Sequence, residues 1–342
     1  MRTRRLVGAL AAATLALTVA ACGGGSEPSR AVDGPWEDVV AAANKEGKVT
    51  LYSTQAAPRL ADLEKQFEKA YPAIDLEIVR GVDADLLSKI DAESRSGKGI
   101  GDVAVITDIS WMKANADNDV AVPVVGPAFD APDYHRASSI VDDRFFLEGA
   151  VILGLGWNTK ALPGGVKDAR GLLDPALKGK IGIVNPATSP TYLDYYAHIE
   201  KYYGEDYIKA LAAQNPRIYP SNQPLGQAVA SGEVTVGLMT DPMLTSKDAG
   251  APVDWTATEH VWGAKWYGLA LGSSPHPNAA QVLADFMVTP AGQAATTPGY
   301  ASVLPDIAGS VANAQEVADQ NLDVTIGQGA QKYRSELEQI LK

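Results

Sequence analysis

The chain has 342 residues, 46% of them hydrophobic and 20% charged, and these proportions exclude a disordered or fibrous protein. Its 41 acidic and 29 basic residues give a formal net charge of −12 at pH 7, which disfavours nucleic acid or anionic lipid as a partner. A single cysteine excludes a disulfide framework. The length exceeds what one hydrophobic core usually serves, so two domains or lobes are expected.

Residues 1–21 have the features of a signal peptide. Three arginines precede an apolar run that is too short to span a bilayer comfortably. The run ends in Val-Ala-Ala-Cys, which resembles a bacterial lipobox, so Cys22 is expected to carry a lipid anchor. Residues 22–34 begin with glycines and serines that suit a flexible, lipidated tether. The alternative is an ordinary signal peptide with a chance cysteine. The main prediction is an extracytoplasmic protein, anchored to the outer face of the cell membrane.

Helix and strand patterns then alternate through the first half of the chain. Strands are predicted from β-branched and apolar runs, and helices from apolar residues at helical spacing. The predicted elements are a helix at 38–46, a strand at 48–53, a helix at 58–70, a strand at 74–79, a helix at 84–96 and a strand at 102–106. This order is typical of a parallel α/β sheet.

A second cycle follows a long apolar run at 149–157. Several of its helices begin with proline in the first turn, where the missing N–H costs nothing. The predicted elements are strands at 181–184, 234–239 and 266–271, and helices at 190–203, 222–231, 277–287, 290–296 and 328–341. The sequence contains no internal repeat, no zinc-type ligand spacing and no glycine-rich phosphate loop.

Five segments in order carry a family resemblance. They read GKVTLYSTQ at 47–55, GIGDVAVITDISW at 99–111, GWNTK at 156–160, LLDPALKGKIGIV at 172–184 and VASGEVTVGL at 229–238. Together, behind a lipobox, they resemble the extracellular solute-binding lipoproteins of ABC importers. The resemblance is strongest to the cluster that binds ferric iron, thiamine, polyamines or phosphonates.

The resemblance implies a two-lobed α/β architecture, the type II periplasmic-binding-protein fold. Each lobe would be a mixed sheet flanked by helices, with the ligand in the cleft between lobes. The expected boundaries are 35–148 plus 271–342 for lobe 1, 158–258 for lobe 2, and 149–157 and 259–270 for the hinge crossings. It also implies a monomer without cofactor or catalytic activity, which delivers a small molecule to a membrane permease.

Candidate ligand groups in lobe 1 follow two predicted strands. Ser53, Thr54 and Gln55 leave the first strand and open onto a helix whose start can hold an anion. Thr107 and Asp108 follow the strand at 102–106, at the end where open α/β sheets bind ligands. The alternative for both groups is local, because these side chains also suit the capping of the next helix.

Candidate groups in lobe 2 lie at two helix starts and one strand end. Ser189, Thr191 and Tyr192 begin the helix at 190–203, where a capping role is also expected for the serine or threonine. Asn222 opens the next helix, and Asp241 follows the strand at 234–239. A carboxylate here pairs with an amine or accepts hydroxyls, whereas the helix starts favour an anion. The sequence therefore predicts an anionic or zwitterionic solute, such as a phosphonate or an amine.

Ferric iron, free or chelated, is the alternative ligand. Ferric-binding relatives carry two adjacent tyrosines where this chain reads Met-Thr-Asp-Pro-Met at 239–243, and often a histidine where it has Ala56. Tyr195 and Tyr196 are adjacent, but they lie inside a predicted helix, where neighbouring side chains point about 100° apart. No metal site is predicted.

A membrane-anchored hydrolase is the less favoured alternative of another class. The four histidines are scattered, and neither a G-x-S-x-G elbow nor an H-E-x-x-H motif is present. A serine–histidine–aspartate triad is spatial, so the sequence leaves it open. A sensor or adhesin that uses the same two-lobed fold without transport is a third possibility.

Overall fold

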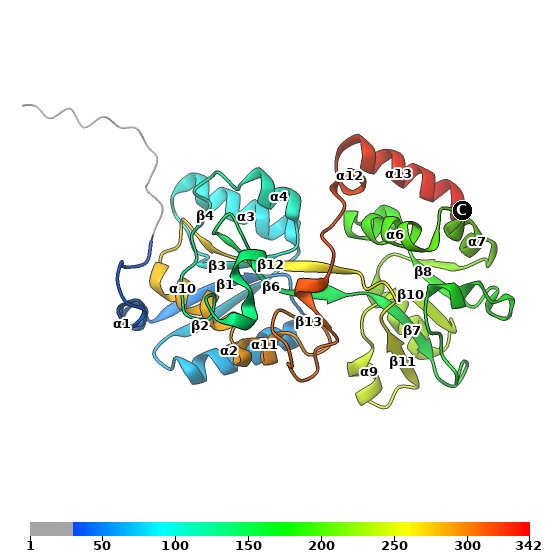
Figure 1. The fold of residues 1–342 in the computed structure, drawn as a ribbon, viewed down its shortest axis with the longest axis horizontal. Helices are drawn as coiled ribbons and strands as arrows, with labels where there is room; N and C mark the ends of the chain where they lie inside the picture. The colour runs from blue at the N-terminus through cyan, green and yellow to red at the C-terminus, as the bar shows by residue number, and fades with distance from the viewer. Residues whose placement is uncertain (1–29) are drawn as a thin grey trace, which may run out of the picture.

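The computed structural model describes residues 30–342. The predicted signal peptide, Cys22 and most of the tether lie outside these residues. The described chain forms two α/β bodies side by side, joined by a narrow waist (Figure 1). Each body has its own cluster of buried apolar side chains. Within residues 30–342, no helix combines the length and the hydropathy that crossing a membrane requires.

The first body is built on a nine-stranded sheet whose main path runs β14-β13-β6-β12-β3-β1-β2, with β4 and β5 beside it. Its elements before the waist are α1 (Trp36–Glu46), β1 (Lys48–Ser53), α2 (Ala57–Ala70), β2 (Asp75–Arg80), α3 (Asp83–Ser96), β3 (Val103–Ile106), α4 (Ile109–Ala114), β4 (Ala121–Val122), the 3-10 helix η1 (Pro132–Tyr134), α5 (Arg136–Ser139), β5 (Ile140–Val141) and β6 (Phe145–Ile152). Its later elements are β12 (Gly263–Leu271), α10 (Pro277–Met287), α11 (Pro290–Thr296), β13 (Ala301–Ser302) and β14 (Ala312–Asn313).

The second body is built on a five-stranded sheet in the order β11-β7-β10-β8-β9. Its elements are β7 (Gly154–Asn158), β8 (Ile181–Val184), α6 (Pro190–Tyr203), α7 (Asp206–Ala213), β9 (Arg217–Tyr219), α8 (Asn222–Ser231), β10 (Val236–Thr240), α9 (Leu244–Asp248) and β11 (Val253–Thr256). Two helices from the end of the chain, α12 (Leu322–Thr325) and α13 (Gly327–Ile340), lie on the same body.

Parallel pairing sets which loops meet at the waist. β1 pairs in parallel with β2 and with β3, so the carboxyl ends of these three strands share one edge of the first sheet. That edge faces the second body (Figure 1). In the second sheet, β8 pairs in parallel with both β10 and β9. Loops that follow the strands of both sheets are therefore available to a site between the bodies.

Three stretches of chain cross the waist. The apolar run at 149–157 is divided between β6 and β7, with a break at Leu153, and forms the first crossing. The chain returns through the segment that joins β11 to β12. The third crossing is residues 317–321, where Val317 lies in the core of the first body and the Asn321 N–H donates to Asp194 of α6 at 2.7 Å.

The end of the chain differs from the expected boundaries, which placed residues 271–342 in lobe 1. Buried side chains of α13, Ala330 and Leu337, belong to the core cluster of the second body, together with Leu341. Residues 322–342 therefore pack against lobe 2. The helical pattern at 328–341 shows an apolar face, but not which sheet layer that face covers.

The local elements follow the sequence pattern closely. In α2, Leu60, Leu63 and Phe67 are buried at helical spacing, and they pack against the first sheet. α1 ends at Gly47, whose φ of +74° suits glycine at the end of a helix. Strand β12 begins three residues before the predicted start at 266, because its first residues pair with β6 at the waist. Short elements such as β4, α5 and β9 were not predicted.

Candidate ligand-binding cleft

A cleft of about 350 Å³ lies between the two bodies. The first body contributes side chains that follow β1, β2 and β3, and the second contributes residues at the start of α8 and after β10. Its lining residues are Thr54, Ala56, Arg80, Gly81, Val82, Asp83, Thr107, Val151, Ser221, Asn222, Gln223, Asp241, Trp266 and Tyr300. Both bodies are needed to form it, so a change in their separation changes the site.

The first wall of the cleft carries an exposed cation. Arg80 ends β2, and its Nε donates to the Gln55 carbonyl at 2.8 Å, which holds the guanidinium beside the loop after β1. Among residues 30–342, no carboxylate forms an ion pair with Arg80. Its remaining N–H groups are therefore free of any internal carboxylate and can bind an anionic ligand.

Three helix N-termini also border the cleft. α2, α3 and α8 each begin beside lining residues, and none has a side chain that caps its first N–H groups. The N-cap residues are Ala56, Val82 and Ser221. Uncapped helix N-termini concentrate positive potential and N–H donors. The first turn of α3 already carries Asp83 and Asp85, so the features that favour an anion are Arg80 and the starts of α2 and α8.

Thr54 and Thr107 differ in how their hydroxyls are satisfied. Thr107 donates its hydroxyl to the Asp83 carboxylate, and its backbone N–H donates to the other oxygen of the same carboxylate at 3.1 Å. The Thr54 hydroxyl oxygen is buried, with no hydrogen-bond partner among the residues described. A buried hydroxyl without a partner is unusual, and here it lines the cleft, where a ligand oxygen would satisfy it.

The second wall carries a carboxylate next to strained backbone. Asp241 directly follows β10, where the pairing with β7 shifts between Leu238 and Thr240. Met239, the extra residue at this shift, has a φ of +79°, which is rare for a residue other than glycine. Such bulges redirect the following side chain, and strain of this kind is common at functional sites.

Burial controls the charge of this wall. Desolvation raises the pKa of Asp241 to about 6, while the Asn222 side chain opposes the shift. Burial also raises the pKa of Tyr300 to about 12; the Asp241 charge adds to this shift, and Arg59 and Arg80 oppose it. The first body therefore contributes Arg80 together with Asp83 and the rings of Trp266 and Tyr300, and the second body contributes the Asp241 carboxylate.

Four of the ten predicted ligand residues line the cleft: Thr54, Thr107, Asn222 and Asp241. Two others cap helices. Asp108 accepts from the Trp111 N–H at 2.9 Å at the start of α4, and Ser189 accepts from the Thr191 N–H at 3.2 Å at the start of α6. For these two residues the local alternative describes the observed contact.

The remaining predicted residues support the lining from behind. Ser53 and Gln55 are fully buried and bond to each other, so they do not reach the cleft. The Tyr192 hydroxyl donates to the Asn222 side-chain oxygen at 3.3 Å and so orients a lining residue. Thr191 is half-buried in the first turn of α6 and is not among the lining residues.

Sequence reasoning missed Arg80, Asp83 and Tyr300 as lining residues. The signal for Arg80 was present, because the rule that ligands bind beyond strand carboxyl ends applies to the second predicted strand as well as to the first and third. Tyr300 carried no local signal, since it reaches the cleft through the late return of the chain to the first sheet.

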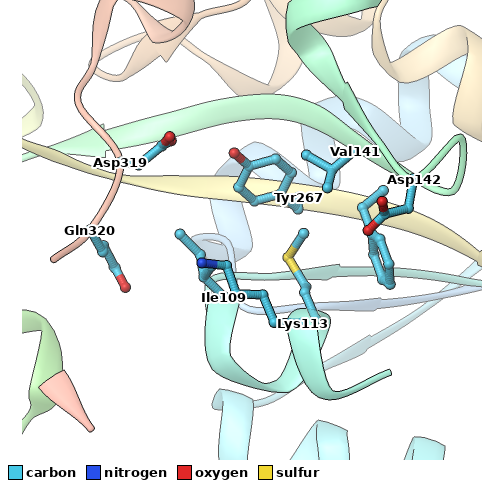
Figure 2. A pocket seen from close by; sticks show the side chains of 9 residues that line it. Ile109, Lys113, Val141, Asp142, Tyr267, Asp319 and Gln320 are labelled. Carbon is cyan, nitrogen blue, oxygen red and sulfur yellow. The ribbon is translucent and has the colours of Figure 1, made fainter. Parts of the chain in front are cut away.

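A second pocket, of about 240 Å³, lies on the other side of β12 (Figure 2). Tyr267 lines it, whereas the preceding residue, Trp266, lines the cleft, as expected for neighbours on a strand. Its walls are mostly apolar side chains of the first body, with Asp319 and Gln320 of the third crossing at its rim. Because it draws little from the second body, lobe closure would not enclose a ligand there.

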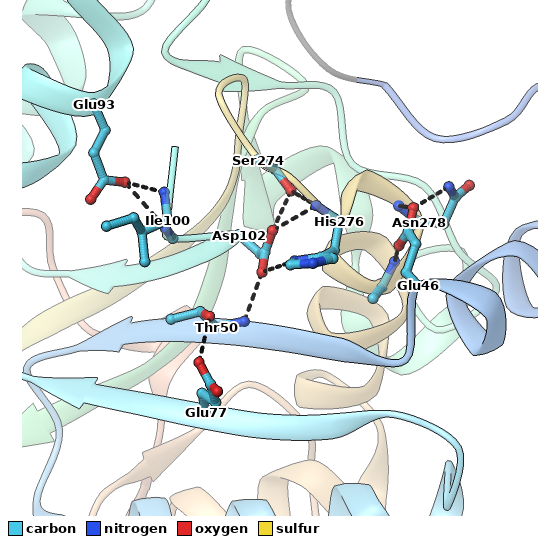
Figure 3. A network of polar contacts seen from close by, with 11 residues as sticks. Glu46, Thr50, Glu77, Glu93, Ile100, Asp102, Ser274, His276 and Asn278 are labelled. Carbon is cyan, nitrogen blue, oxygen red and sulfur yellow. Dashed lines mark hydrogen bonds and ion pairs between the residues drawn. The ribbon is translucent and has the colours of Figure 1, made fainter. Parts of the chain in front are cut away.

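A serine, a histidine and an aspartate do meet, at the other end of β3 (Figure 3). Asp102 accepts from the Ser274 hydroxyl at 2.5 Å and from His276 Nδ1 at 3.0 Å. It also accepts from the Thr50 backbone N–H at 2.8 Å. In a nucleophilic triad the serine bonds to the histidine, and here both donate to the carboxylate. The cluster joins β1, β3 and the start of α10.

The adjacent tyrosines of α6 do not form a site in the cleft. Tyr195 and Tyr196 are fully buried, and the Tyr196 hydroxyl donates to the Val184 carbonyl at 2.7 Å. Within residues 30–342, no three histidine, cysteine, aspartate or glutamate side chains are grouped so as to hold a metal ion.

Two α/β bodies with a polar cleft at the carboxyl ends of their strands define a two-lobed protein of the periplasmic-binding-protein type. The family model of bacterial extracellular solute-binding proteins matches residues 49–297, well over half of the chain. The chain belongs to this family, as its sequence motifs indicated. A search among curated proteins finds no match to the chain.

Solved structures share the fold at low sequence identity. The substrate-binding protein of an ABC transporter from Agrobacterium tumefaciens is 15% identical, with a TM-score of 0.68 over 87% of this chain and 96% of that one. Iron-bound HitA from Pseudomonas aeruginosa is 21% identical, with a TM-score of 0.60 over 86% and 98%. AfuA from Actinobacillus pleuropneumoniae, solved with fructose-6-phosphate, is 21% identical, with a TM-score of 0.59 over 86% and 97%.

Proposed function

We propose that this solute-binding protein captures a small anionic or zwitterionic solute between its lobes and delivers it to the permease of an ABC importer. The observation that carries the proposal is that Arg80 and the uncapped N-terminus of α2 border the cleft from the first body, and the uncapped N-terminus of α8 borders it from the second. An oxyanion, such as a phosphonate, phosphate or carboxylate, fits these donors. Asp241 would pair with an amine or accept hydroxyls at the other end of the ligand.

The proposed cellular setting rests on the first residues of the sequence. Export through residues 1–21 and lipidation of Cys22 would hold the mature protein, as a monomer, at the outer face of the cell membrane. The tether would leave the lobes free to close and to meet the permease. Closure buries a small ligand and creates the shape that a permease can distinguish from the empty form.

Ferric iron remains the second candidate, because iron-bound HitA shares the fold. This chain lacks the paired tyrosines at 239–243, and Asp241 is the carboxylate that lines the cleft there. A chelated ferric ion would present anionic groups to Arg80, whereas a bare ion would need more anionic oxygens than the cleft residues supply.

The test is a thermal-shift screen of the protein with inorganic phosphate, 2-aminoethylphosphonate, a sugar phosphate, spermidine, thiamine and ferric citrate. A compound that binds only the folded form raises its melting temperature. Stabilisation by the phosphonate or phosphates, and not by spermidine or thiamine, supports the proposal. Stabilisation by ferric citrate alone would favour the iron alternative.

Arg80→Gln tests the anion site directly. Losing a charged donor costs about 1.5–3 kcal/mol of binding, so the affinity for an anionic hit should fall more than tenfold. The melting temperature without ligand should change little, because Arg80 is exposed. Arg95→Gln, at another exposed arginine at the end of α3, is the matched control and should bind normally. Equal affinity in both variants would remove Arg80 from the site.

A further inference from the structure

Glu148 is a fully buried carboxyl at the point where the first crossing leaves the first body. The pairing of β6 with β12 matches Gly149 to Trp266 and Leu147 to Tyr267, so Glu148 is the extra residue of a bulge. It is the only residue of β6 without a partner on β12. A bulge bends its strand and redirects a side chain, and this one does so immediately before the hinge.

The Glu148 side chain bonds to the loop that borders the cleft. Gln55 Nε2 donates to one carboxyl oxygen at 2.8 Å, and the carbonyl of Gln55 accepts from Arg80 Nε at 2.8 Å. Gln55 Oε1 accepts from the Ser53 hydroxyl, so the amide has a single orientation. The contacts run without a gap from the hinge strand to the cation of the proposed ligand site.

The backbone of Glu148 extends the same network to a second segment of the first body that borders the cleft. Its carbonyl accepts from Gln293 Nε2 of α11 at 2.8 Å, and Gln293 Oε1 accepts from the Ser302 hydroxyl at 2.8 Å. Ser302 belongs to β13, two residues after Tyr300 of the cleft. Glu148 therefore stands between two of the segments that shape the cleft, and both contacts depend on the bulge.

The surroundings of Glu148 provide no positive charge. Gln55 faces it from the loop after β1, Thr296 from α11 and the phenol of Tyr134 from η1. Among residues 30–342 it forms no ion pair, and its second carboxyl oxygen has no hydrogen-bond partner. An unpaired charge in such a site is costly, so the carboxyl favours its neutral form. Burial raises the pKa of Glu148 to about 7, although the hydrogen bond from Gln55 opposes the shift.

We propose that Glu148 is a positioning residue that, in its protonated form, couples the hinge strand to the loop at residues 53–56 and holds that loop in its ligand-binding shape. When the proton leaves, the buried carboxylate needs hydration. Gln55 contacts Glu148 while its neighbours Thr54 and Ala56 line the cleft, so opening this loop is the route by which water would reach the charge. Opening this loop hydrates the charge and releases the carbonyl that holds Arg80. The site is then less ordered above neutral pH than below it.

The test follows amide hydrogen exchange of residues 53–57 in the full chain without ligand, at about pH 5.5 and about pH 8.5, corrected for intrinsic exchange. Since one pKa unit corresponds to a tenfold difference, protection of this loop should be at least tenfold lower at the higher pH. Glu148→Gln copies the neutral acid, so its loop should stay protected at both pH values. Wild-type protection that does not change with pH, or an equal pH response in the variant, would overturn the proposal.

Asp285→Asn is the matched control for a merely structural role. Asp285 is a second buried acid of the first body, its pKa is raised by burial to about 6, and it accepts from the Ala128 N–H at 2.7 Å, away from the loop. This variant should keep the wild-type response of residues 53–57. A flattened response in both variants would mean that global stability, and not Glu148, controls the loop.

Gln55→Met tests the same coupling if Glu148→Gln does not fold. It removes the amide link while leaving the acid, so the loop should be weakly protected at both pH values. A persistent tenfold response in this variant would contradict the coupling. The inference rests on the proposed function only in identifying residues 53–56 as ligand-binding. Since the measurement uses no ligand, failure of every probe to bind would leave its outcome unaffected.

Discussion

Arg80 and Asp241 come from opposite bodies, and they differ in how far they are buried. Arg80 is exposed and forms no ion pair among residues 30–342, whereas Asp241 is half-buried and burial raises its pKa to about 6. A ligand that brings a positive group to Asp241 offsets the desolvation of the carboxylate. At neutral pH the Asp241 carboxylate is therefore more stable when a cationic or hydroxyl group of a ligand contacts it than when the cleft holds no ligand.

Asp241→Asn should have opposite effects on binding and on stability. The folded pKa lies above the usual value of 3.8, so the folded state holds more protons between about pH 4 and pH 6, and the wild type loses stability as pH rises through this window. The loss is at most about 3 kcal/mol. The asparagine variant avoids it, so its melting temperature should rise relative to wild type from pH 4 to pH 6, while affinity for an amine-bearing hit falls at least tenfold.

The contrast for this prediction is Asp254→Asn. Lys247 donates to Asp254 at 2.9 Å and lowers the pKa of that carboxyl, so the sign of the pH effect reverses. Its variant should be slightly less stable than wild type near neutral pH and should bind normally. A melting temperature for Asp241→Asn that stays below that of the wild type throughout would show that the carboxylate is stabilising.

At the scale of elements, the packing of the last helix, α13, shows that lobe 2 is built from two separate stretches of the chain. α13 is separated from the second sheet by more than 70 residues of chain, yet Leu337 is fully buried in the core of the second body. The Tyr333 hydroxyl also donates to Glu200 of α6 at 2.6 Å. The helix therefore completes lobe 2 from outside its continuous sequence, and residues 317–321 form a third hinge segment.

Leu337→Ala should destabilise the protein by about 2–5 kcal/mol, because it removes buried methyl groups and leaves a cavity. Urea unfolding measures this loss, and hydrogen exchange should locate it in α6 and α13 and not in α2. Glu338→Ala, at the exposed neighbouring position, should have little effect. Loss of protection in the first body instead would contradict the packing of α13 on the second body.

At the scale of the molecule, three narrow crossings allow the bodies to change their separation. Within residues 30–342 the bodies are joined by the chain at the ends of β6 and β12 and by the 317–321 segment, and Lys265 of β12 pairs with Asp319 of that segment at 2.8 Å. A ligand that contacts both walls favours the closed form, by as much as its affinity differs between the two forms. Ligand binding in the cleft and closure of the two bodies are therefore coupled.

Small-angle scattering tests closure in solution. The radius of gyration should fall when the anionic hit of the thermal-shift screen is saturating, because closure brings the two bodies together. Arg80→Gln at the same ligand concentration should keep the larger value. An unchanged radius for saturated wild type would mean that the lobes are already closed, or that the solute binds without closing them.

Local patterns determined the elements and the family. The motif at 47–55, the strand at 102–106 and the proline-started helices carry their information within a few residues, so propensity and spacing predicted them. The carboxyl-end rule also found Thr54, Thr107, Asn222 and Asp241, since each directly follows a strand or opens a helix.

Only the tertiary structure decided the rest. Tyr300 and Trp266 reach the cleft, Glu148 meets Gln55 and α13 joins lobe 2 through contacts between segments far apart in the chain, and such contacts leave no local pattern. The roles of Asp108 and Ser189 were decided in the same way, because a capping residue and a ligand-binding residue look alike until the direction of the side chain is known. Burial, which sets the charges of Asp241 and Glu148, is a property of the folded surroundings and not of the residue.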